Sequence, residues 1–292
     1  MNQQTDKAIR KPVWLKRNLP TGPTYEKVRT LLRKGNLHTV CQEAKCPNLW
    51  ECFSKKTATF LIMGSRCTRN CRFCAIEHGS MEALDRDEPR RVARAVENMG
   101  LHYVVITSVT RDDLPDGGAA HFAATIKAVR EQVSGALIEV LIPDFQGNAD
   151  ALYTVLDAMP DVLNHNIETV PRLYPLARPQ AIYDRSLELL KRVSVRNPSI
   201  PVKSGLMVGL GETFAEIQTT FRDLVAAGCQ ILTVGQYLQP SRDHLPVARY
   251  VRPEEFEKLR ATALDMGFKE VASGPFVRSS YQAKDLYQAV AE

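Results

Sequence analysis

The chain has 292 residues, of which 44% are hydrophobic and 24% are charged, and its formal net charge is +5. These values are typical of a globular protein, and no apolar run is long enough to span a membrane. The Lys and Arg residues are spread along the chain rather than gathered in one stretch, so we expect neither a membrane nor a nucleic-acid partner.

Six short runs of β-branched and aliphatic residues predict six strands, and apolar residues at helical spacing follow each of them. The expected strands are 59–63, 103–107, 138–141, 162–166, 202–208 and 231–235, and the last expected helix is 253–266. Repeated βα units imply a parallel sheet with right-handed crossovers. Six units fit a partial barrel or an open doubly wound sheet, and the spacing alone does not separate the two.

Two flanking regions do not show this alternation of predicted strands and helices. Residues 1–55 are rich in Pro, Lys and Arg, and the segment after Gly274 shows no clear element. We therefore predict an N-terminal extension over 1–55, a barrel over 56–268 and a C-terminal tail over 269–292. In α/β folds, functional residues gather at the C-terminal ends of the strands, so we expect the site there.

Six of the seven cysteines form two sets of three, and each set is one ligand short of four. The first set has the spacing C-x4-C-x5-C and the second C-x3-C-x2-C, and their members are Cys41, Cys46, Cys52, Cys67, Cys71 and Cys74. An incomplete set leaves one coordination position open for chemistry. No apolar leader begins the chain, so we expect a cytoplasmic location, where cysteines bind metals rather than pair as disulfides. The seventh, Cys229, is expected to be a small buried hydrophobe.

A zinc site is the simplest alternative for the second set. His78 follows Cys74 closely and could supply a fourth ligand. Structural zinc sites, however, usually use four Cys or His ligands in paired C-x2-C or H-x3-H spacings, and C-x3-C-x2-C after a first strand is a more specific signature.

The second set resembles the cysteine motif of the radical S-adenosylmethionine (SAM) enzymes. The resemblance implies that Cys67, Cys71 and Cys74 hold a 4Fe-4S cluster whose fourth iron binds the amino and carboxylate groups of SAM. It also implies that cleavage of SAM yields a 5′-deoxyadenosyl radical, so that the cofactor supplies the chemistry and the protein positions it.

Over nearly its whole length the chain resembles the lipoyl synthase family. Its first cysteine set resembles the ligands of that family's auxiliary 4Fe-4S cluster, and Arg278 to Tyr281 match the RSSY motif, from which a serine completes the ligation. The family implies a partial TIM-type (β/α)6 barrel with N-terminal and C-terminal extensions, in which the tail closes over the auxiliary cluster. We favour Ser280 as the ligand, with Ser279 as the alternative.

The same resemblance implies the reaction and its partners. Two sulfur atoms enter at C6 and C8 of an octanoyl chain attached to a lysine of a lipoyl carrier protein, such as the glycine cleavage H protein or the E2 subunit of an oxoacid dehydrogenase. Two SAM molecules are consumed, and the auxiliary cluster is the sulfur source. An electron donor such as ferredoxin or flavodoxin and an iron–sulfur repair protein are therefore expected.

Residues after three of the strands are candidates for binding SAM. Asp116, Gly117 and Gly118 follow the second strand, although Asp116 could equally cap the next helix. Glu168 follows the fourth strand and is a candidate ribose ligand, or else a solvated loop carboxylate. A glycine-rich stretch follows the fifth strand, where the glycines could also serve only a turn. Its candidate residues are Gly209 and Gly211.

Other polar residues have simpler explanations. We expect His165 to be a hydrogen-bonded core residue rather than a base. Arg178 and Arg242 could contact carboxylates or a cluster edge, although solvation is the simpler explanation for each. Two other classes of protein could carry such cysteine sets: a different radical enzyme with one auxiliary cluster, such as a methylthiotransferase, and a non-catalytic iron–sulfur or zinc protein. The first usually carries a further recognition domain, and the second needs no set of six βα units.

Overall fold

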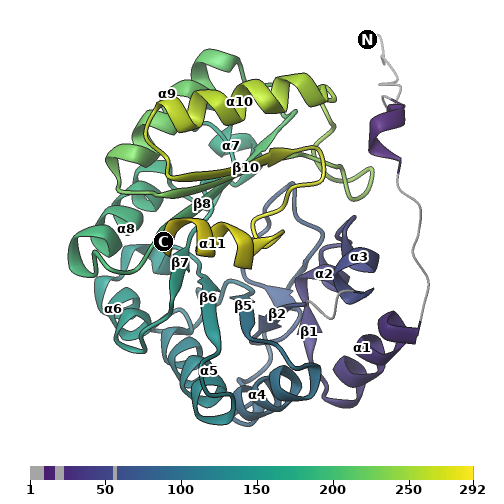
Figure 1. The fold of residues 1–292 in the computed structure, drawn as a ribbon, viewed down its shortest axis with the longest axis vertical. Coiled ribbons are helices and arrows are strands. Elements are labelled where there is room, and N and C mark those ends of the chain that lie inside the picture. The colour runs from purple at the N-terminus through teal and green to yellow at the C-terminus, as the bar shows by residue number, and fades with distance from the viewer. Residues whose placement is uncertain (1–9, 17–22, 55–57, 292) are drawn as a thin grey trace.

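The computed structural model describes residues 10–16, 23–54 and 58–291. At its centre is an eight-stranded sheet (Figure 1). Its order is β1-β2-β5-β6-β7-β8-β9-β10, and every neighbouring pair is parallel except β1 and β2. The strands are β1 (His38–Thr39), β2 (Thr59–Ile62), β5 (Tyr103–Ser108), β6 (Leu137–Leu141), β7 (Val162–Asn164), β8 (Val202–Val208), β9 (Ile231–Gln236) and β10 (Glu270–Gly274).

Six helices follow the strands β2 and β5 to β9 and ring the outer side of the sheet (Figure 1). They are α4 (Glu88–Met99), α5 (Ala119–Gln132), α6 (Ala149–Asp157), α8 (Tyr183–Arg196), α9 (Phe214–Ala226) and α10 (Pro253–Asp265). Each turns an apolar stripe inward; on α5, for example, Phe122, Ile126 and Val129 are fully buried. The sheet order begins at β1 and ends at β10 without the two pairing, so the predicted partial (β/α)6 barrel is confirmed.

All six predicted strands are confirmed, because a parallel strand covered on both faces reads as a nearly continuous apolar run. The prediction missed β10, a seventh parallel strand at the edge of the sheet, in which Val271 is the one buried residue. A strand with so little apolar content carries no clear signal.

The flanking regions contain more structure than predicted. The N-terminal part forms η1 (Val13–Leu15), α1 (Pro23–Lys34), α2 (Val40–Glu43) and α3 (Leu49–Ser54). The tail after Gly274 contains one helix, α11 (Ala283–Ala291), in the described residues. Within α11 only Ala283 and Leu286 are buried, which is too short a pattern to recognise in the sequence.

The segment around α3 and the tail after β10 meet beside β2. The Asn48 side-chain amide donates to the Phe276 carbonyl oxygen at 2.7 Å, and the Tyr281 hydroxyl donates to Glu51 at 3.2 Å. The ring of Tyr287 on α11 lies 6.0 Å from that of Tyr103 at the start of β5. The tail thus passes from β10 to the N-terminal ends of β2 and β5.

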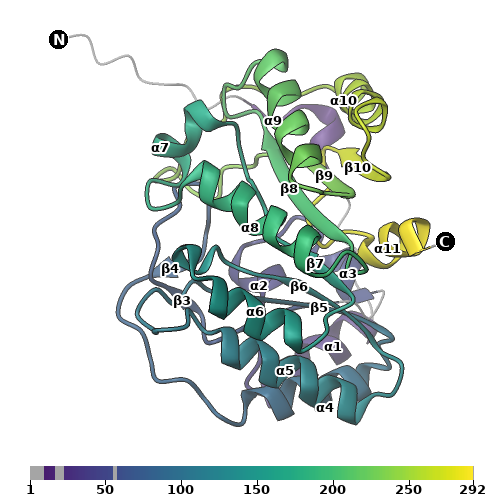
Figure 2. The same cartoon turned by 90° about the vertical axis from the view of Figure 1, so that its left-hand side faces the viewer.

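The loops contribute the remaining short elements. A two-stranded parallel sheet joins β3 (Arg66–Cys67) to β4 (Glu77–His78) in the loop after β2, and this pair lies at the opposite side of the molecule from α11 (Figure 2). The other short helices are η2 (Phe145–Gly147), η3 (Pro171–Leu173) and α7 (Tyr174–Ala177). Within the described ranges, no helix has the length and apolar character that crossing a membrane requires.

Candidate functional site

The second cysteine set lies in the loop after β2, at the C-terminal ends of the parallel strands, as predicted. Cys67 ends β3, and its sulfur accepts the backbone N–H groups of Thr110 at 3.2 Å and Arg69 at 3.4 Å. The carbonyl oxygen of Cys74 pairs with Nε2 of His244 at 2.9 Å. Thiolates that accept N–H groups suit an iron–sulfur cluster, because such bonds stabilise charge on the sulfur.

A buried arginine anchors this loop to the strand ends. Arg69, between Cys67 and Cys71, donates to both oxygens of Asp112 at 2.6 and 2.9 Å and to Asp144 at 2.6 Å. The Arg69 side chain is 4% exposed and that of Asp144 is 0% exposed. Burial opposes the charge on Asp144, but the hydrogen bond and charge of Arg69 lower its pKa to about 2. The loop therefore has a fixed position before any ligand binds.

The thiols of this set are close enough to affect one another. Burial raises the pKa of Cys71 to about 11 and that of Cys74 to about 12, and the neighbouring thiols contribute in the same direction. Arg178 acts in the opposite direction on Cys71. Metal binding would have to displace these protons.

His78, the possible fourth zinc ligand, is exposed on β4, and its backbone pairs with Cys67. In the described part of the chain, no three Cys, His, Asp or Glu side chains converge on the position of a single metal ion. Cys229 is buried, as expected, and burial raises its pKa.

Glu168 lies beside the cysteine loop in a backbone conformation that non-glycine residues rarely adopt, with φ of +66°. Its N–H and carbonyl groups bond to β8, at Gly205 and Met207. Burial raises the pKa of its carboxyl group, while Arg178 and Asn166 oppose the shift. Strained residues of this kind concentrate at ligand sites, which agrees with the predicted cofactor contact without testing it.

Arg178 is buried, so the expectation that solvent surrounds it is wrong. Its Nη1 donates to the Asn166 carbonyl oxygen at 3.1 Å, and its guanidinium lies 5.3 Å from the centre of the Tyr174 ring. Within the described residues, Nε of Arg178 and Oδ1 of Asn166 are buried and have no hydrogen-bond partner. Unsatisfied polar atoms at this position fit a polar ligand such as SAM.

Asp116 caps α5, because its carboxylate accepts the N–H groups of Gly118 and Ala120 at 2.9 Å each. Gly117 and Gly118 have φ of +59° and +89°. A Cβ on Gly117 would come within 2.8 Å of the Phe145 ring, and one on Gly118 would collide with the Met63 sulfur. The local fold accounts for these three residues, and their contact with SAM stays a prediction.

The glycine-rich stretch after β8 is a tight loop around a buried carboxylate. Glu212 accepts the N–H groups of Gly209 at 2.6 Å and of Leu210 at 2.8 Å. Gly209 and Gly211 have φ of +98° and +105°. A Cβ on Gly209 would collide with the Gln236 side chain. Glu212 was missed in the sequence, and the cofactor contact of the two glycines remains a prediction.

The first cysteine set lies at the other end of β2. Cys41, Cys46 and Cys52 line a cavity of about 380 Å³ together with Thr59, which begins β2, and Tyr103, which begins β5. A hydrogen bond with Cys52 and burial raise the pKa of Cys41. The helices α2 and α3 therefore place this set at the N-terminal strand ends, opposite to the C-terminal ends where the site is expected.

The tail supplies a serine to the same cavity. Ser280 lines it with the three cysteines, and its hydroxyl oxygen accepts a hydrogen bond from Thr59 at 2.8 Å. Ser279 is not among the lining residues. The geometry thus favours Ser280 over its neighbour as a fourth donor. A set of three thiolates and one alkoxide fits a four-iron cluster with one weaker ligand.

Polar residues fill the space between the barrel strands. Lys203 and Glu139 are both 0% exposed, with 2.9 Å from Nζ to Oε1, and the Tyr103 hydroxyl donates to Glu139 at 2.7 Å. His165 bonds to the Ile142 carbonyl oxygen and the Ser186 hydroxyl, which confirms it as a core residue.

Comparison with known proteins identifies two family models in the chain. The one described as the radical SAM superfamily matches residues 61–224, and the one described as the N-terminal domain of lipoyl synthase matches residues 1–46. A lipoyl synthase of Desulfotalea psychrophila is 61% identical over 280 residues, which cover 96% of this chain and 94% of that protein. A lipoyl synthase of Rubrobacter xylanophilus is 56% identical over 275 residues, covering 94% and 86%.

Solved structures are similar in fold. The crystal structure of methylornithine synthase has a TM-score of 0.52 at 16% identity and covers 85% of this chain and 82% of that one. The structure of Streptococcus suis SuiB bound to its precursor peptide SuiA has a TM-score of 0.57 at 12% identity and covers 85% of this chain, which spans about half of SuiB (52%).

Proposed function

The chain belongs to the lipoyl synthase family of the radical SAM superfamily, and we propose that its two cysteine sets perform separate parts of that family's reaction. Lipoyl synthases insert two sulfur atoms into a protein-bound octanoyl group. The protein described here is an enzyme of that kind. The main observation in support of separate roles is that the two sets lie at opposite ends of β2.

The set at the C-terminal strand ends is the catalyst in this proposal. Cys67, Cys71 and Cys74 would hold a 4Fe-4S cluster, with the N–H groups of Thr110 and Arg69 stabilising charge on Cys67. When bound, this cluster and SAM supply the radical that removes hydrogen from an unactivated C–H bond.

The strand ends around this set would hold the cofactor. Glu168, Arg178 and Asn166 are placed to bind its polar groups, since two of them have buried atoms with free hydrogen-bonding capacity in the described structure. The turns at Asp116 to Gly118 and at Gly209 to Gly211 would let the backbone approach it closely.

The set at the N-terminal strand ends would hold the sulfur donor. In this proposal a second 4Fe-4S cluster is a substrate ligated by Cys41, Cys46, Cys52 and Ser280. A hard alkoxide is a poor match for soft iron–sulfide and should exchange more readily than a thiolate. A donor that is dismantled in each turnover needs such a releasable ligand.

The strand β2 separates the two cysteine sets. Thr59 lines the donor cavity, and Met63 precedes the catalytic loop. Four residues of extended chain separate them, which is about 13 Å. The C–H bonds that the radical breaks, at C6 and C8, are replaced by C–S bonds at the same carbons, so that end of the octanoyl chain would lie between the two sets, within reach of both.

The proposed division of the chain follows from this arrangement. Residues 1–55 carry donor ligands, residues 56–268 form the radical barrel, and residues 269–292 close over the donor cluster. The tail also supplies β10 to the sheet, so it completes the barrel as well as the donor site.

Incubation of the protein with an octanoylated carrier domain tests the function directly. The protein, loaded anaerobically with iron and sulfide, is mixed with the carrier, SAM and dithionite, and the carrier mass is measured. We expect a gain of two sulfur atoms for the wild type and for Cys229→Ala, a cysteine variant outside both sets. No gain with the octanoyl carrier would refute the proposal.

The remaining partners follow from the chemistry. One electron is needed for each SAM cleaved, which calls for a low-potential donor such as ferredoxin or flavodoxin, and a consumed cluster calls for an iron–sulfur repair protein. The carrier is proposed to be a glycine cleavage H protein or an oxoacid dehydrogenase E2 subunit. We propose the cytoplasm as the location, because in a reducing compartment cysteines bind metals rather than pair as disulfides.

A further inference from the structure

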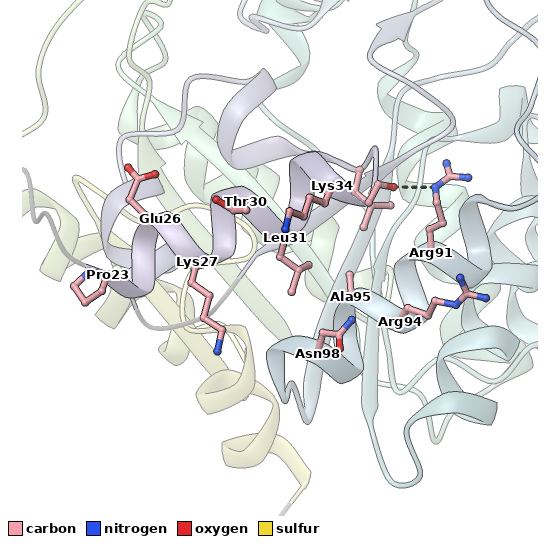
Figure 3. Close-up of a pocket in the computed structure, with 12 residues that line it drawn as sticks. Pro23, Glu26, Lys27, Thr30, Leu31, Lys34, Arg91, Arg94, Ala95 and Asn98 are labelled. Carbon is pink, nitrogen blue, oxygen red and sulfur yellow. Dashed lines mark hydrogen bonds between the residues drawn. The ribbon is translucent and has the colours of Figure 1, made fainter.

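A groove of about 800 Å³ runs between α1 and α4, outside both cysteine sites (Figure 3). Its apolar part is formed by Leu31, Leu37 and Ala95. The carbonyl oxygen of Gly35 accepts a hydrogen bond from Nε of Arg91 at 2.9 Å, which joins the end of α1 to α4 (Figure 3). The groove is therefore held open by a fixed contact between the two helices.

The charge along this groove is positive. Lys27, Lys34 and Arg94 are exposed along its edges, and among the described residues they form no ion pair. Glu26 is the one acidic residue among those that line the groove, and it lies 3.8 Å from Arg29. Three unpaired cations beside an apolar strip suit an acidic protein surface, because complementary charge speeds and orients docking.

The groove lies next to the donor cavity at two points. Asn98 lines the groove, and Gly100, two residues later, lines the cavity. Leu37 lines the groove, and Cys41 lines the cavity; four residues span at most about 14 Å. An octanoyl-lysine arm covers a similar distance, so a protein bound in the groove could deliver such an arm to the cavity.

We propose that this groove docks the carrier protein through an acidic surface beside its octanoyl-lysine. The inference rests on the proposed function and adds the surface by which the substrate is recognised. An acidic electron donor fits less well, because it must approach the catalytic cysteine loop at the opposite strand ends.

Charge reversal on α1 tests the proposal with two substrates. In Lys27→Glu with Lys34→Glu, we expect kcat/KM for an octanoylated carrier domain to fall about tenfold or more, mainly through KM. For a short peptide that bears an octanoyl-lysine, kcat/KM should be unchanged, because the peptide does not need the groove. Arg94→Glu, on the facing helix, should show a smaller loss with the same selectivity.

A matched pair of substitutions provides the control. Lys191 and Lys269 are exposed, on α8 and just before β10, and Lys191→Glu with Lys269→Glu should leave both substrates unaffected. An equal loss for carrier and peptide, or an equal loss in the control pair, would overturn the docking role.

Two further outcomes separate this inference from its alternatives. If the groove variant is slow only with a protein electron donor and normal with dithionite, the groove binds the donor and the proposal is wrong. If the wild type converts neither carrier nor peptide, the proposed function itself fails, which is distinct from a selective loss of carrier activity.

Discussion

The two cysteine sets lie at opposite ends of β2, and they are held in place by different kinds of contact. The catalytic set sits in one short loop that a buried arginine and two aspartates tie to the strand ends. The donor set sits on α2, α3 and their connection, and its serine comes from a position 221 residues beyond Thr59. Buried ion pairs hold the first, whereas partly buried hydrogen bonds, one of them to the Glu51 carboxylate, join the tail to the second.

This difference matches the role proposed for each site. A catalyst must return to the same geometry after every turnover, which a buried ion-pair network favours, since breaking it would leave an unpaired buried charge. In the proposal the donor is consumed and has to be rebuilt, and a tail held by partly buried hydrogen bonds can be released at lower cost than a buried ion-pair network.

The largest expected effect is the loss of different activities when a cysteine of one set or of the other is replaced. Cys71→Ala should abolish both SAM cleavage and sulfur insertion, whereas Cys41→Ala should abolish insertion and retain cleavage. Chromatography of 5′-deoxyadenosine, together with the mass of the carrier, measures both. Loss of cleavage in both variants would mean that the sites do not act separately, and Cys229→Ala should behave as wild type.

The arginine anchor should be the strongest single contact of the catalytic loop. Arg69→Ala should destabilise the protein by about 3 kcal/mol, because the buried charge of Asp144 would keep only its longer contact with Arg185, at 3.5 Å. Urea unfolding of the metal-free protein measures this. Arg192→Ala, which removes an exposed pair with Glu188, should cost about 0.5 kcal/mol or less. Similar losses in the two variants would refute the anchoring role.

Acid should weaken the catalytic end of the barrel through His165. Burial and the charge of Arg178 lower its pKa to about 4, below the value of about 6.5 in an unfolded chain. As the pH falls from 6.5 to 4, the unfolded state gains the proton first, so stability should decrease by about 1.4 kcal/mol per pH unit. Asp144 adds to this pH dependence only below pH 3.8. Its stabilisation is fully present above that pH and is lost as the pH falls toward its lowered pKa of about 2.

Urea unfolding across this pH range checks the assignment to His165. His165→Gln removes the titrating group, so its stability should depend less steeply on pH than that of the wild type. Equal slopes would show that other groups cause the acid sensitivity.

Substitution of the two candidate serine ligands should have different effects on sulfur insertion. Ser280→Ala should lower sulfur insertion about 10- to 100-fold while SAM cleavage continues, as expected for loss of a metal-site contact. Ser279→Ala, the matched neighbour, should be near wild type, because Ser279 does not line the cavity. Normal insertion by the Ser280 variant would exclude that residue as a ligand.

The smallest effect concerns the contacts that hold the tail. Asn48→Ala removes the hydrogen bond to Phe276 and should cost about 1 kcal/mol in unfolding free energy. Limited proteolysis should then cut the tail faster, with the barrel unaffected. Unchanged proteolysis would show that other contacts hold the tail.

The sequence predicted the regular part of the fold and the local part of the site. Buried parallel strands produce apolar runs, and three cysteines within eight residues form a recognisable pattern. The edge strand β10 and the helix α11 bury too few residues to produce such a signal.

Contacts between distant residues were the part that spacing could not predict. Arg69 is one of many arginines in the chain, and nothing near it indicates that Asp112 and Asp144 will enclose it. Arg178 was taken for a solvated residue because its burial depends on the fold around Tyr174. Ser280 was found only through the resemblance of the tail to a family motif.

Iron and sulfide analysis under anaerobic conditions tests the central claim, that one chain holds a catalyst and a separate donor. We predict about eight irons per wild-type chain and about four in the variant with Cys41, Cys46 and Cys52 all changed to Ala, which should still cleave SAM. A wild-type chain that binds only about four irons, or a triple variant that no longer cleaves SAM, would contradict the account.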